Sequence, residues 1–445
     1  MTRQATVVVR GGTVVPLDGT RRWATADVRL SDGRVAEIAA TIPAPADAEI
    51  VDATDALVLP GFVQAHVHVV QSLVRNRAEG LALLPWLRER IWPYEAALSR
   101  DEVGAAARLG IAELLAGGTT TVLDMGTTHD QDGIFAAADE MGIRFASGKC
   151  HMDVGEGVPP GLLEDTDESL AEAERLGARW HGAAAGRLRY AVAPRFVLSC
   201  TRELMAGAVS LARRHGYLLH THASENPVET ALVREVSGMG NVEFLAELGI
   251  GGRDTVLAHC VHLEDHEVGL LASQGTGVAH CPGANLKLAS GIADVPRLLA
   301  AGARIGLGAD GPPCNNRLSV FHEMALAGTL HNLRHGACAL DPWTVLELAT
   351  CRGATAIGLG DEVGSLQPGR RADVVVLRAD TWAMEPGGDP AAMVVYGGGV
   401  ASVRHVLVDG RVVVRDGELV SADADAVRRE ARAAARAVAD RLGWQ

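Results

Sequence analysis

The chain has 445 residues, 48% of them hydrophobic, which suffices for one large domain with a sizeable core and a small companion domain. The formal net charge is -14, from 41 basic and 55 acidic residues, and no long Lys/Arg run occurs, which argues against nucleic acid or an acidic membrane surface as the partner. No apolar stretch approaches membrane-spanning length, and seven cysteines without a Cys-x-x-Cys pair favour reduced thiols in a cytoplasmic protein.

The N-terminal residues carry no signal-peptide pattern and lead directly into short alternating strands. Hairpins with turns at Gly11-Gly12 and Asp32-Gly33 are predicted from the strand-like runs Ala5–Val9, Thr13–Pro16, Asp27–Leu30 and Val35–Ile38. A similar pattern of strand-like runs occurs near the end of the chain, with a turn at Asp409-Gly410. These runs are Ala372–Leu377, His405–Val408 and Arg411–Val414. Together the two blocks predict one small β-sandwich built from both chain ends.

Between these blocks, eight strand-like runs alternate with helical stretches such as Asp101–Leu115 and Arg202–His215. The runs are Leu59–His68, Thr119–Met125, Arg144–Lys149, Arg189–Phe196, Tyr217–Ala223, Thr255–His262, Gly275–His280 and Arg304–Asp310. Eight strands with intervening helices predict an α/β protein with a (β/α)8 TIM barrel. The expected organisation is residues 1–58 as the first part of the β-sandwich, 59–364 as the barrel, 365–422 as the second part, and 423–445 as a C-terminal helix.

Polar residues that could bind a metal collect at the ends of the predicted barrel strands, where such barrels hold their active sites. The first strand ends with His66 and His68, and residues two apart on a strand point to the same side, so both can reach one ion. The alternative is a pair of solvated loop histidines. At this spacing after an apolar run, ligand chemistry favours the metal.

Three further strands end in residues of the same kind. Strand five offers His220 and His222, and the spacing does not choose between them. Strand six ends at His259 and strand eight at Asp310, so the set converges on one end of the barrel. We interpret the two remaining histidines of this region as structural or supporting residues, namely His262 and His280.

In this order along the chain stand the motifs PGFVQAHVH, HTHASEN, LAHCVHL, NLKLASGIADV and LGADG. With them the chain resembles the amidohydrolase superfamily over essentially its whole length. The branch that it is most similar to contains aminohydrolases of purines and triazines, including deaminases of S-adenosylhomocysteine, 5′-methylthioadenosine, 5′-deoxyadenosine and guanine, and s-triazine hydrolases. Five motifs in the right order are far more specific than any one of them.

The resemblance implies a metal site and its catalytic partners. One divalent ion, most simply zinc with iron as the alternative, would be held by His66, His68, His222 and Asp310. Glu225 would donate a proton to the ring of the substrate, His259 would orient the attacking water, and Asp310 would also shuttle protons. Relatives with two ions need a Lys on strand four, but the nearest one here is Lys149 on strand three. One ion is therefore expected.

The substrate-binding residues implied by the resemblance are Gln71, Trp92, Glu95, Arg195 and Phe196. In adenosine-type relatives a Glu like Glu95 grips the ribose hydroxyls, whereas guanine deaminases use residues like Gln71, Arg195 and Phe196 on the base. The structural alternatives are a lid-packing role for Trp92, a salt bridge for Arg195 and a core position for Phe196.

The resulting hypothesis is a hydrolytic deaminase of an aminopurine nucleoside or base, such as 5′-deoxyadenosine, 5′-methylthioadenosine or S-adenosylhomocysteine. The alternatives are a guanine or pterin deaminase and an s-triazine or cyclic-amide hydrolase. A binding protein without activity is disfavoured by the intact set of Glu225, His259 and Asp310. The expected partner is a small N-heterocyclic substrate, with no nucleic acid and no membrane, and the expected assembly is a homo-oligomer.

Overall fold

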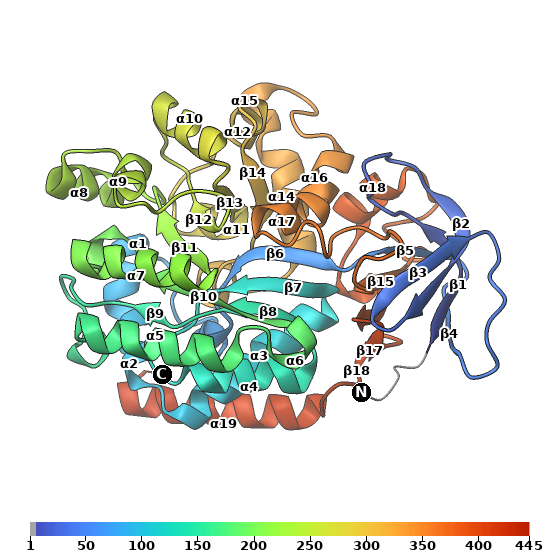
Figure 1. Ribbon diagram of the computed structural model, residues 1–445, viewed down its shortest axis with the longest axis horizontal. Coiled ribbons are helices and arrows are strands. Elements are labelled where there is room, and N and C mark those ends of the chain that lie inside the picture. Colours follow the sequence, from blue (N-terminus) through green and yellow to red (C-terminus); the bar gives the residue numbers. More distant parts are fainter. Residues whose placement is uncertain (1–5, 445) are drawn as a thin grey trace.

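The computed structural model describes residues 6–444 and contains a barrel of eight parallel strands (Figure 1). In sheet order these strands are β14 (Arg304–Leu307), β13 (Gly277–His280), β12 (Thr255–His259), β11 (Leu218–Ala223), β10 (Leu188–Pro194), β8 (Arg144–Ser147), β7 (Thr119–Asp124) and β6 (Phe62–Val67). The two-residue strand β9 (Cys150–His151) extends the pairing of β10. The predicted (β/α)8 barrel is confirmed.

The last strand returns to the first and closes the barrel through Asp310. The backbone N–H of Asp310 donates to the carbonyl of His66 at 3.1 Å, and the N–H of His68 donates to the carbonyl of Asp310 at 3.4 Å. Val67 and Asp310 form the corresponding parallel bridge. The seam of the barrel therefore lies where the sequence predicts metal ligands.

A second sheet is built from both ends of the chain, and it lies on the right of Figure 1. Its order is β18 (Glu418–Leu419), β17 (Arg411–Arg415), β16 (Val403–Val408), β15 (Val374–Arg378), β5 (Ala56–Pro60), β1 (Val7–Val14), β2 (Ala24–Ser31) and β3 (Arg34–Ala39), with β4 (Glu49–Asp52) beside β1. The predicted β domain from both chain ends is confirmed, and its strands are hydrogen-bonded in one continuous order. It has its own apolar core, including Val9, Val28 and Val374.

The first predicted hairpin is wrong. Gly11-Gly12 is a bulge inside the single strand β1, where the register with β2 shifts between Val9 and Gly12. Gly11 has φ of 73°, and a Cβ on Gly12 would lie 2.5 Å from Val58, so both positions require glycine. A glycine pair marks a bulge as well as a turn, and the sequence does not distinguish them. The predicted run Ala5–Val9 also begins at a residue outside the described range.

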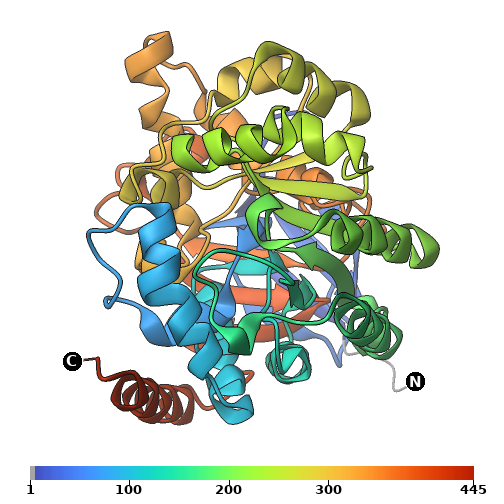
Figure 2. The same cartoon turned by 90° about the vertical axis from the view of Figure 1, so that its left-hand side faces the viewer.

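The predicted first barrel strand, Leu59–His68, crosses from one sheet to the other. Leu59 belongs to β5 of the terminal sheet, and Phe62 begins β6 of the barrel. Gly61 stands between them, where a Cβ would lie 2.1 Å from Thr120. Because β6 starts beside the terminal sheet and all barrel strands are parallel, the strands end on the face away from that sheet, which is turned to the viewer in Figure 2.

Helices surround the barrel and follow most of its strands. The longer ones are α3 (Arg100–Ala116), α4 (Gln131–Met141), α5 (Thr166–Trp180), α7 (Arg202–His215), α8 (Pro227–Ser237), α10 (Asp265–Gln274), α14 (Val320–Leu330) and α19 (Ala424–Leu442). The shorter ones include α1 (Leu83–Trp86), α2 (Trp92–Ala97), α6 (Ala183–Gly186), α9 (Asn241–Glu247), α11 (Pro282–Lys287), α12 (Val295–Ala300), α13 (Pro312–Asn315), α15 (Asn332–His335), α16 (Pro342–Leu348), α17 (Cys351–Ala356) and α18 (Pro390–Ala392). The predicted helix Arg202–His215 matches α7 at both ends.

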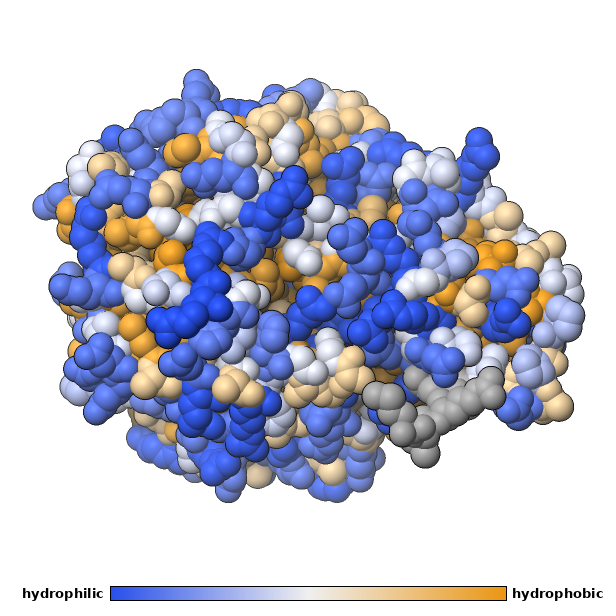
Figure 3. Space-filling view, viewed as in Figure 1, coloured by the Kyte–Doolittle hydropathy of each residue, from blue (hydrophilic) through white to orange (hydrophobic). Residues whose placement is uncertain are grey.

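The C-terminal helix α19 runs along the outside of the barrel next to α3 (Figure 1). Its Arg441 pairs with Glu102 of α3 at 2.9 Å, and Arg108 of α3 pairs with Glu430 at 2.8 Å. Polar side chains predominate on the face seen in Figure 3, with smaller apolar patches between them. Among the described residues, no helix has the length and apolar character needed to cross a membrane.

Candidate active site

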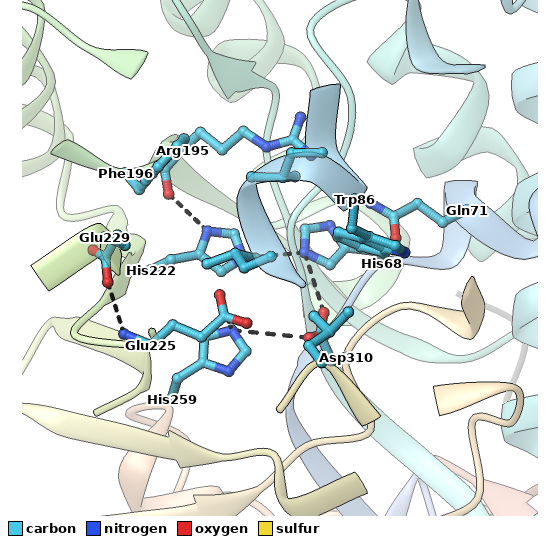
Figure 4. Close-up of a pocket in the computed structure, with 13 residues that line it drawn as sticks. His68, Gln71, Trp86, Arg195, Phe196, His222, Glu225, Glu229, His259 and Asp310 are labelled. Carbon is cyan, nitrogen blue, oxygen red and sulfur yellow. Dashed lines mark hydrogen bonds and ion pairs between the residues drawn. The ribbon is translucent and has the colours of Figure 1, made fainter. Parts of the chain in front are cut away.

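A pocket opens among the ends of the barrel strands (Figure 4). Its walls combine polar and apolar side chains from several strands and the segments that follow them. They are His68, Gln71, Leu83, Trp86, Leu87, Arg195, Phe196, His222, Glu225, Glu229, His259, Leu288 and Asp310.

Two histidines of the pocket direct unprotonated ring nitrogens toward each other. Nδ1 of His68 lies 2.9 Å from the carbonyl of Met125, and Nδ1 of His222 lies 2.7 Å from the carbonyl of Arg195. A carbonyl oxygen only accepts, so both Nδ1 atoms carry the proton and both Nε2 atoms present a lone pair. These Nε2 atoms are 3.2 Å apart. Two lone pairs at this distance repel unless a cation lies between them.

His66 has the same tautomer, and His220 fixes it. Nδ1 of His220 lies 3.1 Å from the carbonyl of Val256, so Nε2 of His220 is an acceptor. Nδ1 of His66, 2.8 Å from that Nε2, must be the donor. The buried Nε2 of His66 is then bare, and no described residue hydrogen-bonds to it. The structure thus separates two roles that the spacing leaves open, because His220 supports His66 while His222 faces the pocket.

Asp310 completes a donor set that fits a divalent cation. Its Oδ1 lies 3.4 Å from Nε2 of His66 and 3.5 Å from Nε2 of His68. Burial, with the neighbouring charges, lowers the pKa of His66, His68 and His222 well below the usual range, so all three are neutral, as metal binding requires. Three imidazoles and a carboxylate are a typical zinc environment.

Glu225 and His259 face this donor set from the other wall (Figure 4). Nε2 of His259 is 3.5 Å from a carboxylate oxygen of Glu225 and 3.8 Å from one of Asp310. Nδ1 of His259 contacts Oδ1 of Asn285 at 2.8 Å, which directs Nε2 into the site. Burial raises the pKa of Glu225 to about 7, the range in which a carboxyl group can both donate and accept a proton near neutral pH.

The start of α8 holds Glu225 in place. Glu229, in the first turn of that helix, accepts from the backbone N–H of Glu225 at 2.9 Å and also from that of Asn226. Asn241 donates to its other carboxylate oxygen. Ser224 has φ of 52°, so the chain turns sharply just before Glu225. Sequence reasoning did not single out Glu229 or Asn285. The capping pattern of Asn226 with a Glu three residues later was the available signal for Glu229.

The predicted substrate residues Gln71, Glu95 and Arg195 form one buried network. Arg195 makes a two-pronged ion pair with Glu95, with Nη1–Oε2 at 2.5 Å and Nη2–Oε1 at 3.2 Å. Gln71 donates its amide N–H to Oε1 of Glu95 at 3.0 Å. Gln71 and Arg195 line the pocket, whereas Glu95 lies behind them and does not.

Of the two predicted aromatic residues, one lines the pocket and the other does not. Phe196 lines the pocket as expected. Trp92 is buried and is not among the lining residues, while Trp86, six positions earlier, is one of them. The buried indole N–H of Trp86 has no acceptor among the described residues, so it is free to donate to a ligand.

Lys149 does not reach the donor set. It is buried just beyond β8, where it pairs with Glu164 and donates to Ser169 at 2.9 Å. The strand-four residues of β10 include no lysine. The geometry therefore offers no bridging lysine from either strand.

Residues 57–413 match the amidohydrolase family, so the chain belongs to that family of metal-dependent hydrolases. It is 36% identical over 413 residues, 92% of this chain and 93% of the relative, to a 5-methylthioadenosine/S-adenosylhomocysteine deaminase of Desulforudis audaxviator. A 5'-deoxyadenosine deaminase of Methanothermobacter thermautotrophicus is 36% identical over 411 residues, 92% and 93% of the two chains. A crystal structure of an adenosine deaminase from Xanthomonas campestris with bound zinc superposes with a TM-score of 0.91 at 29% identity, over 98% of each chain. The protein is accordingly a hydrolase of C–N bonds of the deaminase type.

Proposed function

We propose that the protein removes the amino group of an adenosine derivative, such as 5′-methylthioadenosine, S-adenosylhomocysteine or 5′-deoxyadenosine, and releases ammonia. The observation that carries the proposal is the position of Glu225, a buried carboxyl group across the pocket from three bare Nε2 atoms and 3.5 Å from His259. The names of the relatives support this substrate class.

We propose one zinc ion held by His66, His68, His222 and Asp310, with iron as the alternative. When bound, such an ion makes water nucleophilic near neutral pH. The zinc in the Xanthomonas structure and the mixed nitrogen and oxygen donors support this choice.

The residues around the ion would divide the proton transfers. Glu225 donates a proton to the ring nitrogen next to the carbon that carries the amino group. Asp310 takes the proton of the attacking water and passes it to the departing amine. His259, which is directed by Asn285, orients that water. Arg195, Gln71 and Phe196 would contact the substrate, while Glu95 would position Arg195 and Gln71 from behind.

Measuring kcat/KM by ammonia release tests the proposal with adenosine, 5′-deoxyadenosine, 5′-methylthioadenosine, S-adenosylhomocysteine, guanine, a pterin and an s-triazine. We expect the adenosine derivatives to be the best substrates. Glu225→Gln should lower kcat on the best substrate by about 10²–10⁴ with unchanged zinc content, because the glutamine cannot transfer a proton. Preference for guanine or a pterin would reject the substrate class, and chloride release from a triazine without deaminase activity would reject the reaction.

We also propose a cytoplasmic location and a homo-oligomeric state. All seven cysteines are unpaired, which is typical of a reducing compartment. Two exposed apolar side chains of the surface helix α8, Val228 and Val236, offer area that a second copy could cover.

A further inference from the structure

Two buried histidines outside the catalytic set have no hydrogen-bond partner within residues 6–444. His280 ends β13 and His331 lies at the junction of α14 and α15, and each is only 1% exposed. None of their four ring nitrogens has a partner among the described residues. A buried polar atom without a partner lowers the stability of the fold by about 1–3 kcal/mol. The two rings therefore need hydrogen-bond partners other than the described residues.

The two rings cannot satisfy one another. Their centroids are 5.6 Å apart with the planes tilted by 39°, and no ring nitrogen bonds to the other ring. Burial, with smaller effects of His331 and His259, lowers the pKa of His280 to about 3. Burial likewise lowers the pKa of His331 to about 4. Each ring is therefore neutral, with one donor and one acceptor, which are the groups that a buried water molecule binds.

The inner end of this pair lies beside the catalytic residues. β12 and β13 are neighbours, with Ala258 opposite Ala279, so His259 and His280 occupy successive equivalent positions at the strand ends. Asn285, which contacts His259 through Oδ1, has a buried Nδ2 that lacks a partner. A further unpaired polar atom therefore lies beside His259.

The outer end of the pair lies beside solvent. The charge of Asp294 raises the pKa of His331 against the effect of burial. Asp294 also pairs with Nε2 of His335 at 2.9 Å. In addition, Asp294 lines an open surface groove together with Thr230, Arg234 and His262. This groove shares no lining residue with the substrate pocket.

We propose that His280 and His331 line a water-bearing passage from this groove to His259, and that the passage delivers water to the site while substrate fills the main pocket. Each turnover consumes one water molecule, whose oxygen forms the new C–O bond as the C–N bond breaks. One of its protons leaves with ammonia, and the other replaces the proton that Glu225 gives to the ring nitrogen. A substrate bound against Phe196 and Leu288 blocks the main pocket as a route for the next water molecule. A second route would therefore shorten the time that each turnover takes.

The positions of ordered water test the passage without reference to the substrate. A high-resolution crystal structure of the zinc-loaded protein should contain water within hydrogen-bond distance of both rings, continuing toward Asp294. Ring nitrogens that bond to protein groups with no water between would overturn the proposal. This measurement stands whatever the substrate is.

The kinetic test rests on the proposed deaminase activity. His331→Leu should lower kcat by ~10-fold, equivalent to about 1.4 kcal/mol of barrier, with KM and zinc content unchanged. His331→Gln, which keeps a donor and an acceptor, should stay within about twofold of the parent. The matched control is His322→Leu on the same helix, which should keep the parental kcat. If leucine and glutamine at position 331 reduce kcat equally, or if neither does, the passage does not serve the reaction. If His331→Leu is unfolded, His280→Gln against His280→Leu gives the same comparison.

Discussion

At the scale of single residues, the position of the proton on each histidine ring determines what the site can bind. The carbonyls of Met125 and Arg195 hold protons on the outer nitrogens of His68 and His222, so the inner nitrogens are bare. Backbone strain accompanies this arrangement, because His259 has φ of 75° and Asp310 has φ of 60°. Non-glycine residues rarely adopt such values, and where they do the surrounding structure must hold them, which is typical of functional sites.

The residue pair Glu95 and Arg195 changes the interpretation of the substrate side. In the sequence they belong to two alternative substrates, one contact to ribose and one to a guanine-like base. In the structure they form a single buried ion pair. Arg195 also accepts from the N–H of His222 at 3.1 Å through its backbone carbonyl, so the same residue supports the donor set and the pocket wall.

We predict strong coupling between these two residues. Glu95→Gln and Arg195→Met should each destabilise the protein by about 3–5 kcal/mol, because each leaves a buried charge without its partner. The double variant should lose much less than the sum. Urea unfolding of the four proteins measures the coupling. Effects that add to within about 0.5 kcal/mol would contradict the pairing.

At the scale of elements, the segment between β6 and α3 shows where sequence reasoning failed. The resemblance implied Trp92 as the substrate-binding tryptophan of this segment. The chain there passes through α1, the π-helical turn η2 (Leu87–Ile91) and α2, and a π turn rotates the later residues away from regular α-helical positions. Trp86 therefore lines the pocket, and Trp92 packs in the core. Periodicity cannot report such a turn.

Helix α8 carries the prediction at this scale. Glu229→Ala should lower kcat by ~10-fold, because the N–H of Glu225 loses its buried acceptor and its side chain loses a fixed position. Zinc content should not change. Steady-state kinetics and metal analysis check both statements, with Glu235→Ala, an exposed residue of the same helix, as the control. A normal kcat for Glu229→Ala would mean that α8 does not position Glu225.

For the whole molecule, alternation of strands and helices was sufficient to predict the barrel, and the strand-end polar residues were sufficient to predict that His66, His68 and Asp310 lie together. The choice of His222 over His220 came from the resemblance to the amidohydrolase superfamily, because the spacing on strand five fits either residue. Register within the terminal sheet was not predictable, because β5 pairs with β1 in parallel and with β15 across more than three hundred residues of chain. The bulge at Gly11-Gly12 caused the single strand β1 to be predicted as two strands. The tautomer of His66 depends on its contact with His220. That contact could not be predicted, because it depends on how β6 and β11 are positioned in the barrel.

Removal of the metal should act on the whole molecule. We predict that chelation lowers Tm and abolishes activity, and that one equivalent of zinc restores both, since a ligand that binds only the folded state stabilises it by ~4 kcal/mol at a thousand times its Kd. Differential scanning calorimetry and metal analysis of the stripped and reloaded protein test this. A requirement for two equivalents, or a Tm that is insensitive to chelation, would contradict the single-ion site.

Because the barrel closes at Asp310, the metal site of a nascent chain is completed late in synthesis. During synthesis the N-terminal part emerges first, and His66, His68 and His222 are available long before the strand that supplies their fourth partner. Until β14 reaches β6, those histidines have no carboxylate beside them and the seam has no hydrogen bonds. A fragment of the chain that ends before Asp310 therefore lacks one of the four proposed metal ligands.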